Sequence, residues 1–336
     1  MVNPTSDKRE RTSVAGVVAH AAMILRFLSF LGRHGAGLLA AGLFVGLALP
    51  DAAHALRPLL PTFIFLLTAA TMLRIDWGRV IAHARRPDRI ALVVVWSLAV
   101  SPIAMATTTG LLGVPRPLAE ALVLWAASPP LISMPAIAFL MGLDAALALL
   151  VTVAATLLMP LTLPPLVEGL IGIDLGIGIS SLMVHLALFV LGAVALAALL
   201  RRLIGAERLG RHGTELNGIN VLLLMVFAIA IMDGMQARVI AEPLRVVAFC
   251  AIALGASLLL QLASFLAFAW LDRLSALTVG LIGGNNNMAI VWANLSAAAT
   301  VSPDLMLFFA CVQLPIYMLP AALAPVYRRL APRTAV

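Results

Sequence analysis

The sequence predicts an all-α integral membrane protein that crosses the bilayer ten times. Its 336 residues are 62% hydrophobic and only 11% charged, and the mean hydropathy is +1.08, well above that of a soluble domain. Basic residues gather in short clusters between the apolar runs, and two of those runs are interrupted at matching places in the two halves of the chain. Together these observations favour an inverted repeat of five helices containing two broken helices.

Apolar runs of about 17 residues or more are long enough to cross a bilayer. Ten of them lie near residues 31–50, 59–75, 90–113, 117–141, 144–168, 176–200, 217–236, 244–270, 276–299 and 303–327. The chain therefore divides into an N-terminal segment (1–30), a first repeat (31–172), a second repeat (173–327) and a cytoplasmic tail (328–336). Residues 13–30 form a further apolar stretch that we expect at the membrane interface, with an extra span or a signal-like segment as alternatives.

The loops that alternate between the two sides of the membrane differ sharply in positive charge. Of the 22 Lys and Arg residues, 18 fall on the side that carries both termini; the opposite side has only Arg57, Arg116, Arg238 and Arg245. Because positive loops stay in the cytoplasm, we expect both termini there, in a cell or plasma membrane. An odd number of spans per repeat inverts the second repeat. Because the basic residues are confined to short loops between apolar runs, we expect no nucleic-acid partner. The expected partners are the lipid bilayer and a small solute.

Both interruptions fall in the fourth span of their repeat. Proline removes a backbone donor and glycine lowers helix stability, so the two devices weaken the helix by different chemistry. The predicted helix breaks are Pro129, Pro130, Pro135, Gly283 and Gly284. Lipid offers no hydrogen bonds, so unwound backbone is expected only where it is shielded by protein or lines a watery cavity. Paired breaks indicate a midplane binding site, whereas two ordinary kinks are the alternative.

Polar side chains near these breaks are the candidate binding residues. They are Ser97, Ser128, Ser133, Thr152, Asn285, Asn286 and Asn287. Amides both donate and accept, so this set suits a neutral polar solute or a carboxylate held by amide donors and helix N-termini. The alternative is a purely structural role, in which an asparagine bonds a backbone carbonyl freed at the break.

Several short motifs are spread along the chain. They are Arg85-Arg86-Pro87-Asp88, Ser101-Pro102, Ser128-Pro129, the run from Gly142 to Thr152, Met159-Pro160 and Gly284-Asn285-Asn286-Asn287-Met288-Ala289. With the layout of spans, they resemble the bile acid:sodium symporter family, most specifically over 85–165 and 276–298. The resemblance implies ten helices in an inverted repeat, and a core domain whose two broken helices cross at ion sites beside a panel domain.

The chain departs from that family where the family binds sodium. Ile282 stands at the position of a family glutamate, Asn286 replaces a glutamine, and only Asn287 is retained in that motif. The family's Ser-Asn ligands fall on Met134 and Pro135, a fifth-span serine falls on Ala148, and a third-span glutamine falls on Ser97, while Thr152 is kept. A desolvated cation needs several oxygen ligands. Both sodium sites are therefore expected to be dismantled, and no other cofactor or metal is expected.

We expect a secondary transporter that moves a small organic solute, an organic anion in particular, by alternating access and without strict sodium coupling. The alternatives are a proton-coupled carrier with Asp233 as its carboxylate, a uniporter, or a membrane sensor that binds without transporting. No catalytic motif indicates an enzyme. Cys250 and Cys311 fall in apolar runs and are expected as small buried hydrophobes rather than a disulfide or metal pair. No oligomeric state follows from the sequence.

Other polar residues are expected to serve the structure. Asp144 and Glu120 open predicted spans and are expected to cap them. Gln261, Gln313 and Asn294 lie within apolar runs, where an amide commonly hydrogen-bonds a neighbouring helix. Asp233, near the outer end of the seventh span, is expected to anchor that end at the interface unless it carries a proton.

Overall fold

The computed structural model describes Met23 and residues 25–31, 35–75, 87–172, 178–295 and 302–331, and this described part is helical with no strand. Its elements are α2 (Gly35–Ala48), α3 (Pro50–Leu56), η1 (Arg57–Leu59), α4 (Leu60–Leu73), α6 (Pro87–Val95), η2 (Trp96–Val100), α7 (Ser101–Leu111), α8 (Arg116–Ala126), α9 (Met134–Leu140), α10 (Ala145–Ile171), α11 (Ile179–Ile204), α12 (Ala206–Arg211), α13 (Gly213–Ala230), α14 (Met235–Ala241), α15 (Pro243–Ala267), α16 (Arg273–Gly283), α17 (Met288–Leu295) and α18 (Pro303–Leu330). The predicted all-α class is confirmed.

Seven helical stretches in the described part are long and apolar enough to cross a membrane. They are Pro50–Leu73, Pro87–Leu111, Ala145–Ile171, Ile179–Ile204, Gly213–Ala230, Pro243–Ala267 and Pro303–Leu330. The chain thus has the makeup of a multi-pass membrane protein. Each stretch overlaps a span expected from the sequence, and the other three expected spans coincide with α2 and with the helix pairs α8/α9 and α16/α17.

The second predicted span begins earlier than the sequence indicated. It was placed at 59–75, yet the chain is helical from Pro50 through Leu73 because α3, η1 and α4 follow one another without a gap. Each segment carries a proline in its first turn, at Pro50, Pro58 and Pro61. Proline is tolerated there because its missing N–H would have no partner inside the helix. Prolines therefore divide this span into segments without ending it.

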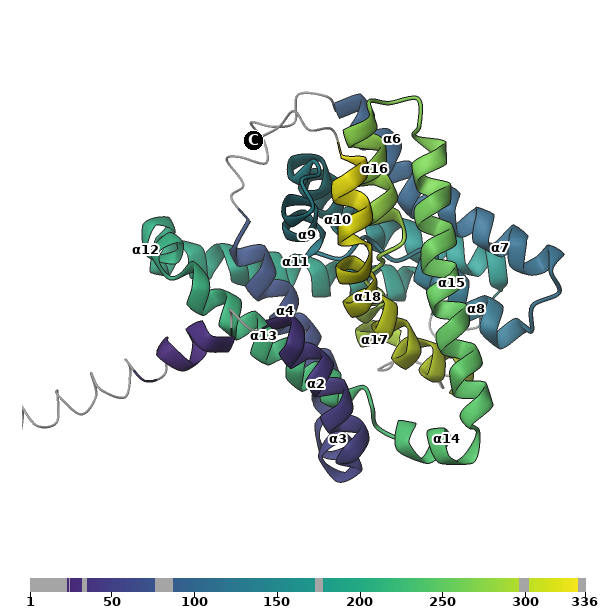
Figure 1. The fold of residues 1–336 in the computed structure, drawn as a ribbon, viewed down its shortest axis with the longest axis horizontal. Coiled ribbons are helices and arrows are strands. Elements are labelled where there is room, and N and C mark those ends of the chain that lie inside the picture. The colour runs from purple at the N-terminus through teal and green to yellow at the C-terminus, as the bar shows by residue number, and fades with distance from the viewer. Residues whose placement is uncertain are drawn as a thin grey trace, which may run out of the picture.

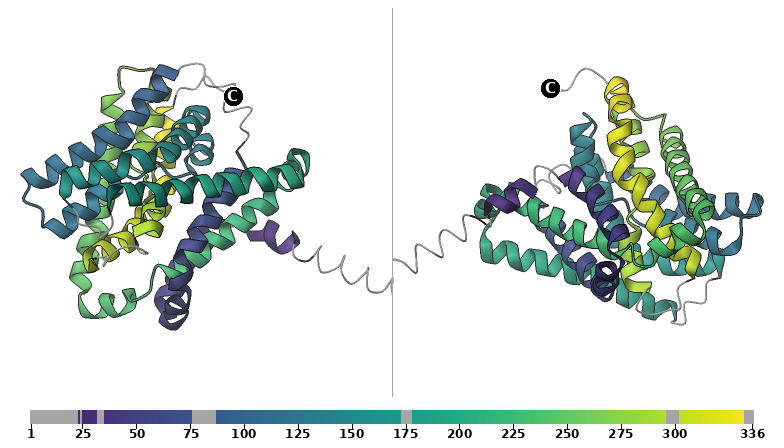
Figure 2. Two further views of the ribbon diagram at one scale, coloured as in Figure 1. Left: turned by 180° about the vertical axis from the view of Figure 1, so that it is seen from behind. Right: turned by 60° about the horizontal axis from the view of Figure 1, so that its bottom comes forward.

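The helices form two groups that lie side by side (Figures 1 and 2). In one group α2 packs along α13 and α11 packs along α4; in the other α15 packs along α16 and α18, and α7 along α8. The pair α2 and α13 is close because Gly46 has no side chain: a Cβ there would lie 2.6 Å from the carbonyl oxygen of Ile229. Contacts of α10 with α11 and of α17 with α4 join the groups.

Loops expected on the cytoplasmic side contact one another. The Arg201 guanidinium donates to the carbonyl oxygens of Leu73 at 3.3 Å and Ile75 at 2.7 Å, and Arg89 pairs with Asp272 at 3.2 Å. These contacts join the end of α4 to the end of α11, and the start of α6 to the start of α16. Each contact joins two loops that the sequence assigns to the same side of the membrane.

Loops expected on the opposite side are likewise joined to each other. Arg57 at the end of α3 pairs with Asp233, which follows α13, at 2.9 Å. Arg245 at the start of α15 pairs with Asp304 at the start of α18 at 2.5 Å. Three of the four basic residues assigned to this side therefore bond within it, since Arg116 also reaches the carbonyl oxygen of Gly172 at 3.3 Å.

The predicted N-terminal segment lies mostly outside the described residues. Residues 25–31 are helical and pack against α13, where Gly218 admits the backbone: a Cβ at Gly218 would lie 1.9 Å from the carbonyl oxygen of Leu28. At the other end, α18 continues through Leu330, so the first residues assigned to the tail belong to this helix.

Candidate functional site

The two helix breaks predicted from the sequence meet each other in space. Residues 127–133 separate α8 from α9, and residues 284–287 separate α16 from α17. The Leu131 N–H donates to the Asn285 carbonyl at 2.8 Å, and the Asn287 N–H donates to the Pro129 carbonyl at 2.7 Å. Pro130 and Asn286 face each other between these two bonds as an isolated antiparallel bridge. The unwound segments therefore satisfy part of each other's backbone.

At the first break, serine hydroxyls bond backbone carbonyls in the last turn of α8. The Ala126 carbonyl would receive the N–H of residue 130 in a continuous helix, but Pro130 has none. The Ser101 hydroxyl lies 3.3 Å from that carbonyl oxygen, and the Ser128 hydroxyl donates to the Leu124 carbonyl at 2.8 Å. The hydroxyl of Ser128 is thus already bonded to the backbone of its own segment.

Two residues assigned to this break do not contribute to it. Pro135 is in the first turn of α9, where a proline starts a helix rather than interrupts one, so the break depends on Pro129 and Pro130. Ser133 precedes α9 and is exposed, and its side chain makes no capping hydrogen bond. The structure does not place Ser133 with the buried polar groups.

At the second break, glycine permits close packing against α15. A Cβ at Gly283 would lie 2.1 Å from Ser264 Oγ, and one at Gly284 would lie 2.3 Å from the Ser257 carbonyl oxygen. The Asn285 amide donates to the Leu281 carbonyl at 2.7 Å, replacing the backbone bond that the break removes. Asn285 therefore has the structural role that was the alternative for each asparagine.

Several buried polar atoms around the crossing have no hydrogen-bond partner among the described residues. Three belong to residues predicted for the site: Ser97 Oγ, Thr152 Oγ1 and Asn286 Nδ2. All three residues are at most 4% exposed. A buried polar group without a partner costs about 1–3 kcal/mol, so such groups call for a specific explanation. A solute or water that supplies the missing partners would provide one.

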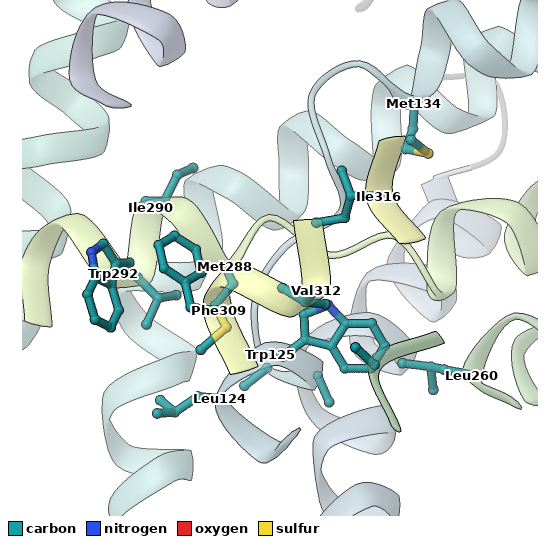
Figure 3. Packing of buried hydrophobic residues seen from close by; sticks show 14 of the residues in the cluster. Leu124, Trp125, Met134, Leu260, Met288, Ile290, Trp292, Phe309, Val312 and Ile316 are labelled. Atoms are coloured by element: carbon teal, nitrogen blue, oxygen red, sulfur yellow. The ribbon is translucent and has the colours of Figure 1, made fainter. Parts of the chain in front are cut away.

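Sequence reasoning missed three further unpartnered groups, Trp125 Nε1, Ser257 Oγ and Gln261 Nε2. Trp125 lies in the last turn of α8, where its ring meets that of Phe308 of α18 edge-on, with the centroids 6.4 Å apart; Figure 3 shows Trp125 within the cluster of buried hydrophobic side chains. The side chain of Gln261 lies against Gly284, since a Cβ there would be 2.4 Å from Gln261 Cγ. The only signal in the sequence was that Trp125 lies close to Pro129 along the chain. The position of Gln261 beside Gly284 depends on the fold.

The sodium positions of the resembling family carry apolar side chains here. Ile282, Met134 and Ala148 are fully buried and contribute no oxygen ligand. The retained hydroxyls of Thr152 and Ser97 do not make up a cation site, which needs several oxygens and a charge to offset that of the ion. The residues present therefore do not fit sodium. Within the described part of the chain no group of three His, Cys, Asp or Glu side chains is placed to hold a metal.

Asp233 is already paired at the outer end of α13. Its carboxylate lies 2.9 Å from the Arg57 guanidinium and 3.3 Å from His54 Nδ1. This geometry favours the expected anchoring role, because the carboxylate ties the end of α13 to His54 and Arg57 of the neighbouring segment. Asn287, the third amide, is half-buried, and its backbone rather than its side chain makes the bridge to Pro129.

The structural expectations for the remaining polar residues have mixed outcomes. Asp144 caps α10 by accepting the N–H groups of Ala146 and Leu147; Gln261 joins two helices by accepting from the Tyr327 hydroxyl at 2.9 Å. Both predictions are confirmed.

Three others are wrong. Glu120 lies inside α8 and pairs with Arg116 at 2.9 Å instead of capping. Asn294 and Gln313 each bond a carbonyl four residues earlier in their own helix, at 2.8 and 3.2 Å. A backbone acceptor one turn away is always within reach of such a side chain, whereas a partner on another helix is not.

Comparison with known proteins adds no family assignment. No protein-family model matches the chain, and no curated protein matches it either.

Proposed function

We propose that the protein is a ten-span secondary transporter that moves a small organic anion across the membrane by alternating access. The crossing of the two helix breaks carries this proposal. Non-helical backbone at membrane depth is tolerated only inside protein or beside a watery pathway, and paired discontinuous helices are how secondary transporters build a midplane site. The resemblance to bile acid:sodium symporters implies the same architecture.

The ten spans are α2, the seven long apolar stretches, and the two broken pairs α8/α9 and α16/α17. The packing supports an inverted repeat. Exchanging the two halves turns the contact of α2 with α13 into that of α11 with α4, the contact of α7 with α8 into that of α15 with α16, and the contact of α18 with α8 into that of α10 with α16. All six contacts are present. The first group of helices then corresponds to a panel domain and the second to a core domain.

Hydrogen-bond donors at the crossing favour an anionic solute. Asn286 Nδ2 and Trp125 Nε1 are buried donors without an acceptor. The short helix α17 begins just after Asn287, and its first N–H groups form the positive end of a helix dipole. A carboxylate or sulfonate supplies acceptors for donors of this kind. A free cation would find no matching charge there.

Coupling to sodium is not strict in this proposal, because Ile282, Met134 and Ala148 supply no ligands. Asp233, the candidate carboxylate for proton coupling, is already engaged in an ion pair with Arg57. A uniporter is therefore the simplest mode of transport. Both termini lie in the cytoplasm, as the charge of the loops favours.

Uptake into liposomes tests the proposal. The purified protein is assayed with a panel of radiolabelled carboxylates and sulfonates, including a taurine-conjugated bile acid, under an inward sodium gradient, a proton gradient or no gradient. We expect saturable uptake of at least one anion that is unchanged when sodium is replaced by potassium. A steep and saturable sodium dependence would contradict the proposal. Saturable binding without flux under any gradient would favour a sensor over a transporter.

A further inference from the structure

Two cysteines distant in sequence are neighbours across the interface of α15 and α18. Cys311 is buried on α18 and Cys250 is half-buried on α15, and both are free thiols. Cys311 Sγ lies 3.9 Å from the carbonyl oxygen of Val246, which precedes Cys250 by one turn on the same face of α15. Cys311 therefore lies against the face of α15 that carries Cys250. The sequence indicated separate small hydrophobes, and the fold brings them together.

The two helices are held in register near these cysteines. Arg245 at the start of α15 pairs with Asp304 at the start of α18. Cys250 follows Arg245 by five residues and Cys311 follows Asp304 by seven, so the thiols lie about 8 and 11 Å along their helices from that ion pair. Both are thus at a similar depth, near the end of the bundle opposite the tail.

We infer that Cys250 and Cys311 are a site of reversible oxidation, at which the two thiols become a disulfide that joins α15 to α18. Each S–H bond breaks and one S–S bond forms. Two electrons and two protons pass to an uncharged two-electron acceptor able to enter the bilayer, such as a quinone or an azodicarboxamide. Half-buried Cys250 is the point of access, and Cys311 completes the bond.

The surroundings favour a disulfide over a bound metal ion. Both cysteines lie in apolar helix segments, where a thiolate that ligates a metal would bury charge. A disulfide is uncharged and needs no ionic partner. It also constrains the unfolded chain, so the oxidised protein is expected to be the more stable form.

Oxidation of the full-length protein in liposomes with the azodicarboxamide diamide tests this inference. Remaining thiols are blocked with N-ethylmaleimide and the digest is analysed by mass spectrometry. We expect a pair of peptides joined through Cys250 and Cys311 that dithiothreitol separates, and a higher unfolding temperature for the oxidised form. The variants Cys250→Ser and Cys311→Ser lose both effects.

A matched control keeps one thiol on each helix but moves the thiol of α15 to a face that points away from α18. Ala248 is exposed and lies on nearly the opposite side of α15, so the double variant Cys250→Ser, Ala248→Cys is expected to form no link. Equal cross-linking in this control would mean that helix motion, not the native geometry, joins the thiols. That result would overturn the inference, as would a native chain that leaves the reaction with both thiols free or linked only between two copies.

Discussion

The two helix breaks meet in one crossing but are made by opposite chemistry. At the α8/α9 break, prolines remove backbone donors; the hydroxyl of Ser101 lies 3.3 Å from the Ala126 carbonyl oxygen that Pro130 leaves without one, and Ser128 bonds the Leu124 carbonyl. At the α16/α17 break, glycines admit α15 so closely that no side chain fits, and the amide of Asn285 bonds the stranded carbonyl. The first break is fixed by its own covalent structure, whereas the second depends on a neighbouring helix.

The two breaks also differ in whether their polar side chains are already hydrogen-bonded to the backbone. Around the first break the nearby hydroxyls of Ser101 and Ser128 are occupied with the backbone. At the second, Asn285 is occupied but the amide of Asn286 is not. The glycine break should therefore be more sensitive to added volume, and its second asparagine should affect the solute more than the fold.

The largest effect is expected when the close packing of the glycine break is disturbed. The change Gly284→Ala places a Cβ 2.3 Å from the Ser257 carbonyl oxygen, and backbone cannot move aside as a side chain can. We expect a loss of about 1–3 kcal/mol or more in the free energy of unfolding. Thermal unfolding of the detergent-purified protein, followed by loss of the monodisperse peak, measures it.

The matched control is Gly255→Ala on α15, where a Cβ would meet nothing within 4 Å. Alanine favours a helix over glycine, so this change should be neutral or slightly stabilising. Equal losses in both variants would show that added volume at the break has no special cost.

Adjacent asparagines are expected to give opposite results. Asn285→Ala leaves the Leu281 carbonyl without its partner and should cost about 1–3 kcal/mol of unfolding free energy. Asn286→Ala removes a buried amide that has no protein partner, so stability should be kept while solute binding is lost. Thermal unfolding with and without the anion that is transported best separates the two. If Asn286→Ala unfolds earlier and still binds, the functional assignment is wrong.

The sequence was sufficient to locate the breaks but not to rank the residues within them. Proline, glycine and a run of amides in apolar segments are visible without a structure, and they predicted both interruptions; that the two breaks meet was implied by the resemblance to bile acid:sodium symporters. Three consecutive asparagines are chemically identical, however, and only the path of the backbone decides that Asn285 bonds Leu281 while Asn286 does not. The assignment of roles therefore required the fold.

Partners on other helices were the least predictable part of the site. Gln261 and Trp125 reach the crossing because of the faces that α15 and α8 present to it. The residues before and after each of them in the sequence are mostly apolar, so no polar stripe marks the face of the helix that points inward. Asp144 was predictable as a cap because its partners are its own next residues.

A smaller effect is expected at the proline break. Ser101→Ala removes the hydroxyl that lies 3.3 Å from the Ala126 carbonyl oxygen and 3.0 Å from that of Ser97. The loss should be about 1 kcal/mol, because the longer bond is weak and proline still interrupts the helix. Thr107→Ala is the control, since its hydroxyl bonds its own helix at an exposed position. Unfolding temperatures that fall equally in the two variants would deny Ser101 a role at the break.

The smallest effect is expected where α16 begins, before the glycine break. Burial opposes ionisation of Asp272, but hydrogen bonds from Ser275 and the Arg89 guanidinium outweigh it and hold the pKa of this carboxyl below its usual value. The ionised form therefore adds stability at pH values above about 3.9, the unfolded pKa, and that stability is lost as the pH falls through the lower folded pKa. Asp272 is 55% exposed, so its charge is worth only a few tenths of a kcal/mol, about 0.5.

Asp272→Asn isolates this charge, because asparagine keeps an oxygen that caps α16 through the Ser275 N–H. We expect a slightly lower unfolding temperature than the native chain at pH 7 and a smaller difference at pH 3, because the charge is lost as the pH falls toward the lowered pKa of this carboxyl. Glu207→Gln breaks an exposed pair with Arg211 away from the crossing and should change nothing at either pH. A deficit for Asp272→Asn that is as large at pH 3 as at pH 7 would mean that cap geometry, rather than charge, holds the start of α16, and the glycine break would then depend on packing alone.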